Sequence, residues 1–307
     1  MTISTSFIIP HKGRLDFLFQ TVESITKLKG YGETTEIIVV TKEEELTLPE
    51  PLNSQVQVLK VPDEVTISYQ RNLGARNSKG NFLAFLDADV QLNENWLVRV
   101  SELLADDDMI VSAIQISCDD APITEDVRVA LNHINKDKYL ECLAGSNLFL
   151  RRADFDLHGG FPEEMETCED VYFTGKFAKN LLTSKSDFVH LGEDKSFSQL
   201  FKKEIWRAKS NLASVKGRKI QLLELPSLLF PLIAVFAPIL TIILVLLGAN
   251  VAAATILCLG FVPAIAYSLR LKLKTEAVSI FNIFAFYVVY FFARGVGSLM
   301  GIKRERV

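Results

Sequence analysis

The chain has 307 residues, of which 49% are hydrophobic, and carries 33 Lys and Arg against 37 Asp and Glu. This composition excludes a disordered chain, a collagen-like repeat and a small disulfide-rich scaffold. The net charge of −4, with no basic stripe interleaved with aromatic residues, also argues against nucleic acid as a partner.

Charge and hydropathy divide the chain into two parts. Residues 1–219 hold 26 basic and 34 acidic residues, whereas residues 220–307 hold 7 basic and 3 acidic ones and are far more apolar. We therefore expect a soluble domain over 1–219 and a membrane domain over 220–307.

Short apolar runs alternate with amphipathic stretches at the start of the soluble domain. The amphipathic stretches Leu15–Leu28 and Ser68–Ser78 are predicted to be helices. Buried strands are predicted at four places: Phe7–Pro10, Glu36–Val40, Val56–Val61 and Phe82–Leu86. This order is typical of an α/β fold with a mostly parallel sheet flanked by helices. Ligands of such sheets bind at the carboxyl ends of the strands.

The motif Asp87-Ala88-Asp89 lies at one of these carboxyl ends. Two carboxylates spaced i, i+2 along an extended strand point the same way and offer hard oxygen ligands to Mn²⁺ or Mg²⁺. Such a cation would neutralise a diphosphate and stabilise it as a leaving group. Gln91 repeats the spacing and could add a ligand, directly or through water. An isolated Asp-x-Asp can also be a pair of solvated turn carboxylates.

The residues around this motif resemble the family 2 inverting glycosyltransferases. Residues 71–90 read RNLGARNSKGNFLAFLDADV, similar to the family's RNxGxxxAxG helix followed by a strand that ends in Asp-x-Asp. Later residues follow the order of the family's acceptor half: Gly145-Ser146-Asn147, Arg151, Gly159-Gly160-Phe161 and Glu169-Asp170. The resemblance covers roughly residues 6–177. It implies a GT-A-like fold with a nucleotide-binding half over about 1–110 and an acceptor half over about 111–195, before a basic amphipathic segment over about 196–219.

For the donor, the resemblance implies contacts with a nucleoside diphosphate sugar. Pro10 would lie near the nucleotide, and Arg71 and Asn72 would lie near its base and diphosphate. Asp87 would contact the ribose or the metal-bound phosphate, and Asp89 would bind the divalent cation.

For the transfer step, the resemblance implies that Asp170 is the general base, with Glu169 beside it. Thr167 and Asp170 also have the spacing of a capping box that opens a helix, which is compatible with the catalytic role. His190 lies where family members often place a metal or phosphate contact. Its apolar neighbours suit a core residue equally well.

The sequence departs from the family pattern in two places. After the second strand, the turn Val40-Thr41-Lys42-Glu43 replaces a Val-Asp-Asp-Gly-Ser-like turn, so Thr41 would contact the base through its hydroxyl. The Gln-x-x-Arg-Trp motif of processive synthases is absent. Glu204–Arg207 instead lies on a basic amphipathic helix that we expect at the membrane surface, with a contact to the acceptor or the diphosphate as the alternative. A single transfer per encounter is therefore expected.

Three apolar runs in the membrane domain are predicted to span the bilayer, at 225–247, 251–269 and 278–300. The first run, at ~1.5 Å per residue, is longer than a hydrocarbon core of about 30 Å. A three-residue turn, Gly248-Ala249-Asn250, joins the first two spans into a hairpin. Arg294 interrupts the third run, which could be a full span or a re-entrant or interfacial segment.

Basic residues flank these runs on one side. They precede the first span and return between spans two and three at Arg270, Lys272 and Lys274, which predicts a catalytic domain on the cytoplasmic side. A third full span would place Lys303, Arg304 and Arg306 outside, against the same rule. Together these features predict a membrane-anchored, metal-dependent inverting glycosyltransferase of the cytoplasmic or inner membrane.

The acceptor is expected to be a lipid-linked glycan or a glycolipid, as in cell-envelope polysaccharide synthesis. The alternatives are a polyprenyl phosphate acceptor and, in another class, an inert protein that binds a nucleotide sugar within a membrane assembly.

Overall fold

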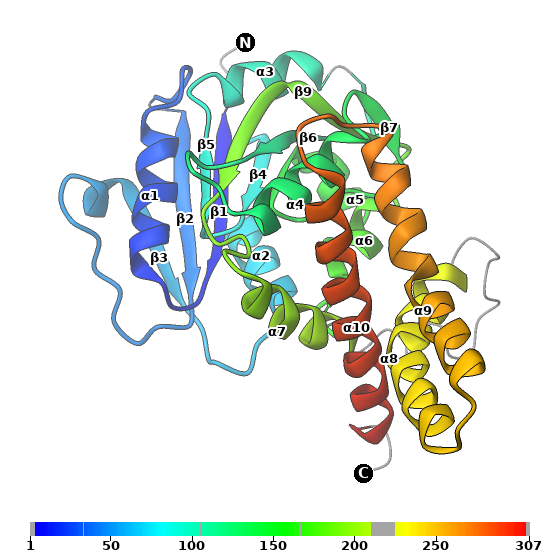
Figure 1. Cartoon of the computed structure of the whole chain (residues 1–307). Helices are drawn as coiled ribbons and strands as arrows, with labels where there is room; N and C mark the ends of the chain where they lie inside the picture. The colour runs from blue at the N-terminus through cyan, green and yellow to red at the C-terminus, as the bar shows by residue number, and fades with distance from the viewer. Residues whose placement is uncertain (1–3, 33, 105, 166, 210–224, 305–307) are drawn as a thin grey trace. The chain divides into compact units, whose positions relative to one another are not determined.

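The structure is a computed structural model that describes residues 4–32, 34–104, 106–165, 167–209 and 225–304 (Figure 1). The chain forms two compact units. Unit 1 comprises Met1–Cys118 and Asn135–Glu193, and unit 2 comprises Asp119–Ile134 and Asp194–Val307. Residues 210–219 of the predicted basic segment lie outside the described residues.

Unit 1 is built on one sheet that, in the described residues, has nine strands in the order β3-β2-β1-β4-β8-β6-β9-β5, with β7 paired to β9. The strands are β1 (Thr5–His11), β2 (Thr35–Thr41), β3 (Val56–Lys60), β4 (Phe82–Leu86), β5 (Val90–Leu92), β6 (Met109–Ile116), β7 (Lys138–Leu140), β8 (Asn147–Arg151) and β9 (Lys179–His190). The four strands predicted from the sequence, β1 to β4, are mutually parallel. Because β5, β7 and β8 pair antiparallel, the whole sheet is mixed rather than mostly parallel.

Both faces of this sheet are covered, as continuous apolar strands require. Side chains alternate along β1, so Phe7 and Ile9 enter one core and Ile8 enters the other. The first core lies under α1 (Leu15–Thr26) and α3 (Trp96–Leu103). The second core receives residues from three helices: α2 (Ile67–Arg76), α5 (Arg152–Leu157) and α6 (Glu169–Thr174).

Helix α2 carries the RNxG segment of the sequence motif and begins close to its predicted start. The hydroxyl of Thr66 caps it by accepting a hydrogen bond from the Tyr69 N–H at 3.2 Å. Gly74 faces β1, and a Cβ at this position would collide with Cγ2 of Ile8. The glycine of the motif therefore lets the helix pack directly on the sheet.

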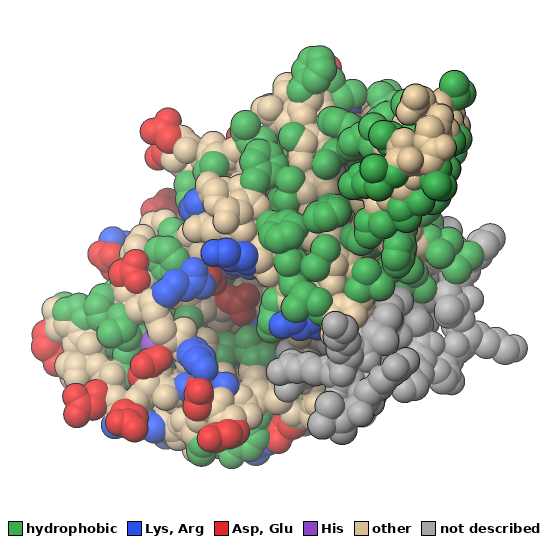
Figure 2. Space-filling model, turned by 60° about the horizontal axis from the view of Figure 1, so that its bottom comes forward, with side chains coloured by type: hydrophobic (Ala, Val, Ile, Leu, Met, Phe, Trp, Pro, Cys, Tyr) green, Lys and Arg blue, Asp and Glu red, His purple; other side chains and the backbone are tan. Residues whose placement is uncertain are grey.

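The described residues of unit 2 form helices α4 (Ile123–His133), α7 (Phe197–Ala208), α8 (Leu225–Leu246), α9 (Asn250–Lys272) and α10 (Ile280–Arg304). Helices α8, α9 and α10 are each long and apolar enough to cross a membrane, as the sequence predicted. In Figure 2, hydrophobic side chains gather over the surface of these helices, whereas charged side chains gather over unit 1. Helix α10, which contains Arg294, runs without a break.

Arg294 in α10 is compensated within unit 2. Its guanidinium donates to the Tyr290 hydroxyl at 2.7 Å, and its Nε lies 3.1 Å from a carboxylate oxygen of Glu204 in α7. Gly297 and Gly301 of α10 lie against the backbone of α7, where any Cβ would collide with a carbonyl oxygen. Helix α7 thus packs closely on α10, and a charge inside an apolar helix is tolerated because it is paired.

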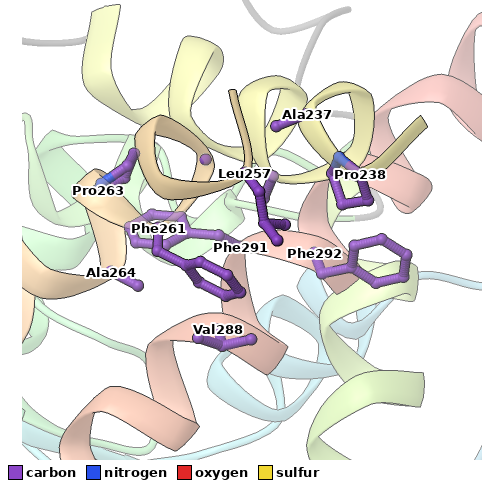
Figure 3. A pocket seen from close by; sticks show the side chains of 11 residues that line it. Ala237, Pro238, Leu257, Phe261, Pro263, Ala264, Val288, Phe291 and Phe292 are labelled. Atoms are coloured by element: carbon purple, nitrogen blue, oxygen red, sulfur yellow. The ribbon is translucent and has the colours of Figure 1, made fainter. Parts of the chain in front are cut away.

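Helices α8, α9 and α10 enclose an apolar cavity of about 150 Å³ (Figure 3). Ala237, Gly260 and Ala264 leave this space because their side chains are small, and aromatic rings such as Phe261 and Phe291 close it. A cavity lined in this way holds no partner for a charged group, so it is no candidate for a nucleotide site.

Candidate active site

A second, polar cavity of about 240 Å³ lies at the carboxyl ends of the central strands of unit 1. It is lined by Pro10, Lys12, Gly13, Arg14, Phe17, Ile67, Asp87, Ala88, Asp89 and His190. Four residues predicted from the sequence to belong to the site line this cavity: Pro10, Asp87, Asp89 and His190. His190 does so although it is 101 residues from Asp89 in the chain. The prediction that ligand-binding groups gather at this sheet edge agrees with this geometry.

Asp87, Asp89 and His190 could together hold a metal ion. Each offers one ligand atom, and these atoms lie within 4.8 Å of one another. Strand pairing sets this arrangement, because β5 pairs with β9 with Val90 opposite His190, and the Leu191 N–H donates to the Asp89 carbonyl at 2.8 Å. Two carboxylates and an imidazole are a donor set that fits a divalent cation such as Mn²⁺.

His190 carries a proton when no cation is bound. Burial by itself lowers the pKa of its imidazole, but hydrogen bonds to Asp89 at 3.1 Å and Glu193 at 3.3 Å outweigh burial and raise the pKa to about 10. A cation that binds this imidazole must therefore displace a proton.

Arg71 connects the metal-ligand group to the acceptor-half residues. Its side chain is 2% exposed and lies 3.0 Å from Asp87 and 2.8 Å from Glu169, with its guanidinium over the Phe161 ring. Burial raises the pKa of both carboxyls, and the Arg71 charge opposes that rise. A guanidinium can bridge two carboxylates in this way because its donors form a planar fork.

Asp170 is held by the backbone around it. Its carboxylate accepts hydrogen bonds from the Gly145 N–H at 2.9 Å and the Val171 N–H at 2.8 Å. A Cβ on Gly145 would lie 2.8 Å from an Arg71 nitrogen and 3.2 Å from Asp170 Cβ, which explains why this motif position is glycine. The capping box suggested by the sequence is wrong, because Cys168 is the N-cap of α6 and no side chain caps the helix.

The sequence profile described as glycosyl transferase family 2 matches residues 6–153, which include β1 from its second residue, β2 to β8 and the Asp-x-Asp motif. Residues 6–153 thus carry a glycosyl transferase family 2 domain. The family and the enzyme class predicted from the sequence are thereby confirmed. A search of curated protein sequences found no match.

One solved structure agrees with this assignment at the level of the fold. The mannosyltransferase PcManGT from Pyrobaculum calidifontis, in complex with GDP-Man and Mn²⁺, is 15% identical with a TM-score of 0.62 over 97% of this chain and 87% of that one. It confirms the predicted GT-A-like fold followed by apolar helices. S. aureus TarS 1–349 (14% identity, 73% of this chain and 77% of that one) has a TM-score of 0.48. GalNAc-T7 with UDP, GalNAc and Mn²⁺ (16% identity, 68% and 50%) has one of 0.47.

Six predicted site residues do not line the polar cavity: Arg71, Glu169 and Asp170, described above, and Thr41, Asn72 and Gln91. Thr41 is fully buried at the end of β2, where its hydroxyl lies 2.9 Å from Nδ1 of His11. Asn72 accepts a hydrogen bond from the Phe161 N–H at 2.9 Å and so fixes the Gly-Gly-Phe loop. Gln91 lies in β5 with an exposed side chain.

Sequence reasoning missed several residues of the glycosyltransferase site. Lys12 and Arg14 line the cavity, and Glu193 supports the His190 ring through Nδ1. The position of the first two, directly after β1, would have been enough to find them. Gly192 has no such signal in the sequence, yet a Cβ there would collide with the Asp89 carboxylate, so glycine lets the chain pass beside the metal-ligand group.

Proposed function

We propose that the chain is a membrane-anchored, metal-dependent inverting glycosyltransferase that uses a nucleoside diphosphate sugar. The observation that carries this proposal is the group Asp87, Asp89 and His190 in a polar cavity of a family 2 domain. Three helices apolar enough to cross a membrane follow that domain in the chain and support the anchoring.

The donor and the cation would bind in the polar cavity. When bound, the cation would neutralise the diphosphate and stabilise it as a leaving group. Asp89 and His190 would be its ligands together with Asp87, and the imidazole favours Mn²⁺ over the oxygen-preferring Mg²⁺. Because the similar mannosyltransferase structure contains GDP-Man and Mn²⁺, a GDP-sugar is the first donor to test.

Asp170 would act as the general base. The acceptor hydroxyl gives its proton to this carboxylate, its oxygen bonds to the anomeric carbon, and the bond from that carbon to the diphosphate breaks. Two backbone N–H groups donate hydrogen bonds to the Asp170 carboxylate and so orient it. Glu169 pairs with Arg71, so it would position the base rather than accept the proton.

The acceptor would be a lipid-linked glycan or a glycolipid, presented at the cytoplasmic face of the membrane. The basic residues of α7 and those at the end of α9, Arg270 and Lys272, support this side by the positive-inside rule. The spacing Asp87-x-Asp89-x-Gln91 in the sequence fits the alternative, a polyprenyl phosphate acceptor. Since Gln91 is exposed and does not line the cavity, that spacing gives no support for it.

The experiment measures release of nucleoside diphosphate by detergent-purified protein from GDP-, UDP- and dTDP-sugars, with and without Mn²⁺. We expect slow Mn²⁺-dependent release from one donor and its loss in Asp89→Asn. Asp170→Asn should bind the nucleotide as tightly as wild type yet fail to transfer to an added glycolipid. The matched control is Asp106→Asn, which removes a surface carboxylate paired with Lys179.

Either of two results would reject the proposal. If nucleoside diphosphate is released without Mn²⁺ and equally fast by Asp89→Asn, the proposed metal site has no role in the reaction. Binding of nucleotide sugars without release or transfer, with every acceptor tested, would support the inert alternative instead.

A further inference from the structure

Arg14 is a cavity residue to which the proposed chemistry gives no role. It lies between β1 and α1 and lines the same cavity as the metal-ligand group. Its Nη2 lies 2.7 Å from Oδ2 of Asp89, and its side chain is 56% exposed, against 11% for Asp89. A cationic side chain thus already occupies one carboxylate oxygen of the residue that would bind the metal.

The backbone holds Arg14 at this place. Gly13 and Arg14 both have left-handed conformations, with φ of 66° and 43°, and the Gly13 N–H donates to a Glu43 carboxylate oxygen at 2.7 Å. Non-glycine residues in this region are uncommon and cluster at ligand clamps. The guanidinium also lies 4.9 Å from the centroid of the Phe17 ring, which limits its freedom to turn to solvent.

Arg14 and a divalent cation compete for Asp89. In the structure, one oxygen of Asp89 faces Arg14 and the other faces His190. A cation bound by Asp87, Asp89 and His190 would repel the guanidinium at short range. Arg14 would then leave Asp89 but remain on the cavity wall, with five N–H donors and no acceptor capacity of its own.

A diphosphate is the partner that satisfies these donors. A guanidinium is planar and pairs with phosphate oxygens through two parallel hydrogen bonds. We propose that Arg14 pairs with Asp89 while the cation site is empty and moves its guanidinium to the donor diphosphate when cation and donor bind. This inference rests on the proposed function, and it makes Arg14 a diphosphate-binding residue that also exchanges with the metal.

The test separates binding of the metal from binding of the nucleotide. Binding of Mn²⁺ alone is followed by the electron paramagnetic resonance signal of free Mn²⁺. Binding of GDP and of UDP is then titrated at saturating Mn²⁺. The variants are Arg14→Gln, Arg14→Lys, Asp89→Asn and, as a matched control, Arg99→Gln, which removes a surface arginine paired with Glu102.

For Arg14→Gln, the two affinities should respond differently. Mn²⁺ alone should bind at least as tightly as in wild type, because a competing cation has been removed. The nucleoside diphosphate should bind about ten- to hundredfold more weakly, the loss expected for one charge-assisted pair. Arg14→Lys keeps the charge without the planar fork and should be intermediate, and Arg99→Gln should match wild type in both titrations.

Unchanged diphosphate binding in Arg14→Gln would overturn the inference, and so would weaker binding of Mn²⁺ alone, since Arg14 would then support the metal site. A folding defect would appear as a lower unfolding temperature in Arg14→Gln. In that case the same two titrations are made on Arg14→Lys, which keeps a cationic side chain beside Phe17. Weaker binding of the diphosphate than in wild type, with Mn²⁺ binding retained, supports the inference, and unchanged diphosphate binding overturns it. Wild-type binding of Mn²⁺ and nucleotide by Asp89→Asn would instead show that the proposed function is at fault.

Discussion

Replacing Arg71 by Met tests the link between the donor and acceptor halves of the site. The side chain is 2% exposed, and its loss leaves the Asp87 and Glu169 carboxylates without their common counter-ion. Removing one partner of a buried ion pair destabilises by about 3–5 kcal/mol. Since 1 kcal/mol shifts the Tm of a domain of this size by about 2–4 °C, we expect a drop of about 6–20 °C.

The loss should depend on pH in a defined direction. Burial raises the pKa of Asp87 and of Glu169, and the Arg71 charge opposes that rise, so both pKa values should rise further in the folded state of Arg71→Met. A raised folded-state pKa means that stability is complete below the unfolded pKa and is lost as pH rises from the unfolded pKa through the folded pKa. The drop in Tm relative to wild type should therefore be smaller at pH 5 than at pH 7.

Thermal unfolding in detergent, followed by tryptophan fluorescence, measures this effect. The control combines Arg71→Met with Asp87→Asn and Glu169→Gln. The triple variant lacks the two carboxylates that Arg71→Met leaves without their counter-ion, so it should regain most of the lost stability. If the triple variant unfolds at the same temperature as Arg71→Met, the loss comes from packing and the electrostatic reasoning is wrong.

Three further outcomes follow from contacts at single positions. Gly192→Ala should weaken Mn²⁺ binding about tenfold or more, measured by the signal of free Mn²⁺, because its Cβ would displace the Asp89 carboxylate. Gly74→Ala should lower stability by about 1–3 kcal/mol through overpacking against Ile8, seen as a lower Tm with Mn²⁺ binding retained. Glu204→Gln should destabilise by about 3–5 kcal/mol, seen as a lower Tm of the detergent-solubilised chain, because it removes a buried carboxylate that three arginines share.

Each of these outcomes has its own check. Gly32→Ala is the control for both glycine variants, because a Cβ there meets nothing within 4 Å.

For Glu204, burial raises the carboxyl pKa, but the charges of Arg128, Arg207 and Arg294 outweigh burial and lower the pKa. Its stabilisation is present above the unfolded pKa and is lost as pH falls through the folded pKa. The Tm difference between Glu204→Gln and wild type should thus shrink in acid, and a constant difference would contradict this assignment.

Local patterns in the sequence determined most elements of the donor half. The apolar runs at β1 to β4 and the helix before the Asp-x-Asp motif were predicted within a few residues of their observed bounds, and β4 matched at both ends. The three apolar helices were also predicted, because an uncharged run of about 20 residues is readable without tertiary context. Each of these elements is predicted from residues that are adjacent in the sequence, so no knowledge of the tertiary structure is needed.

Tertiary structure decided which residues meet. His190 lies next to Asp89 only because β5 and β9 pair. Arg71 contacts both Asp87 and Glu169 only because α2 packs on β1 through Gly74. The same folding turns Asn72 toward the Gly-Gly-Phe loop and leaves Gln91 exposed, although both belong to sequence motifs. Strand pairing and close packing are set by residues distant in sequence, and no local pattern records them.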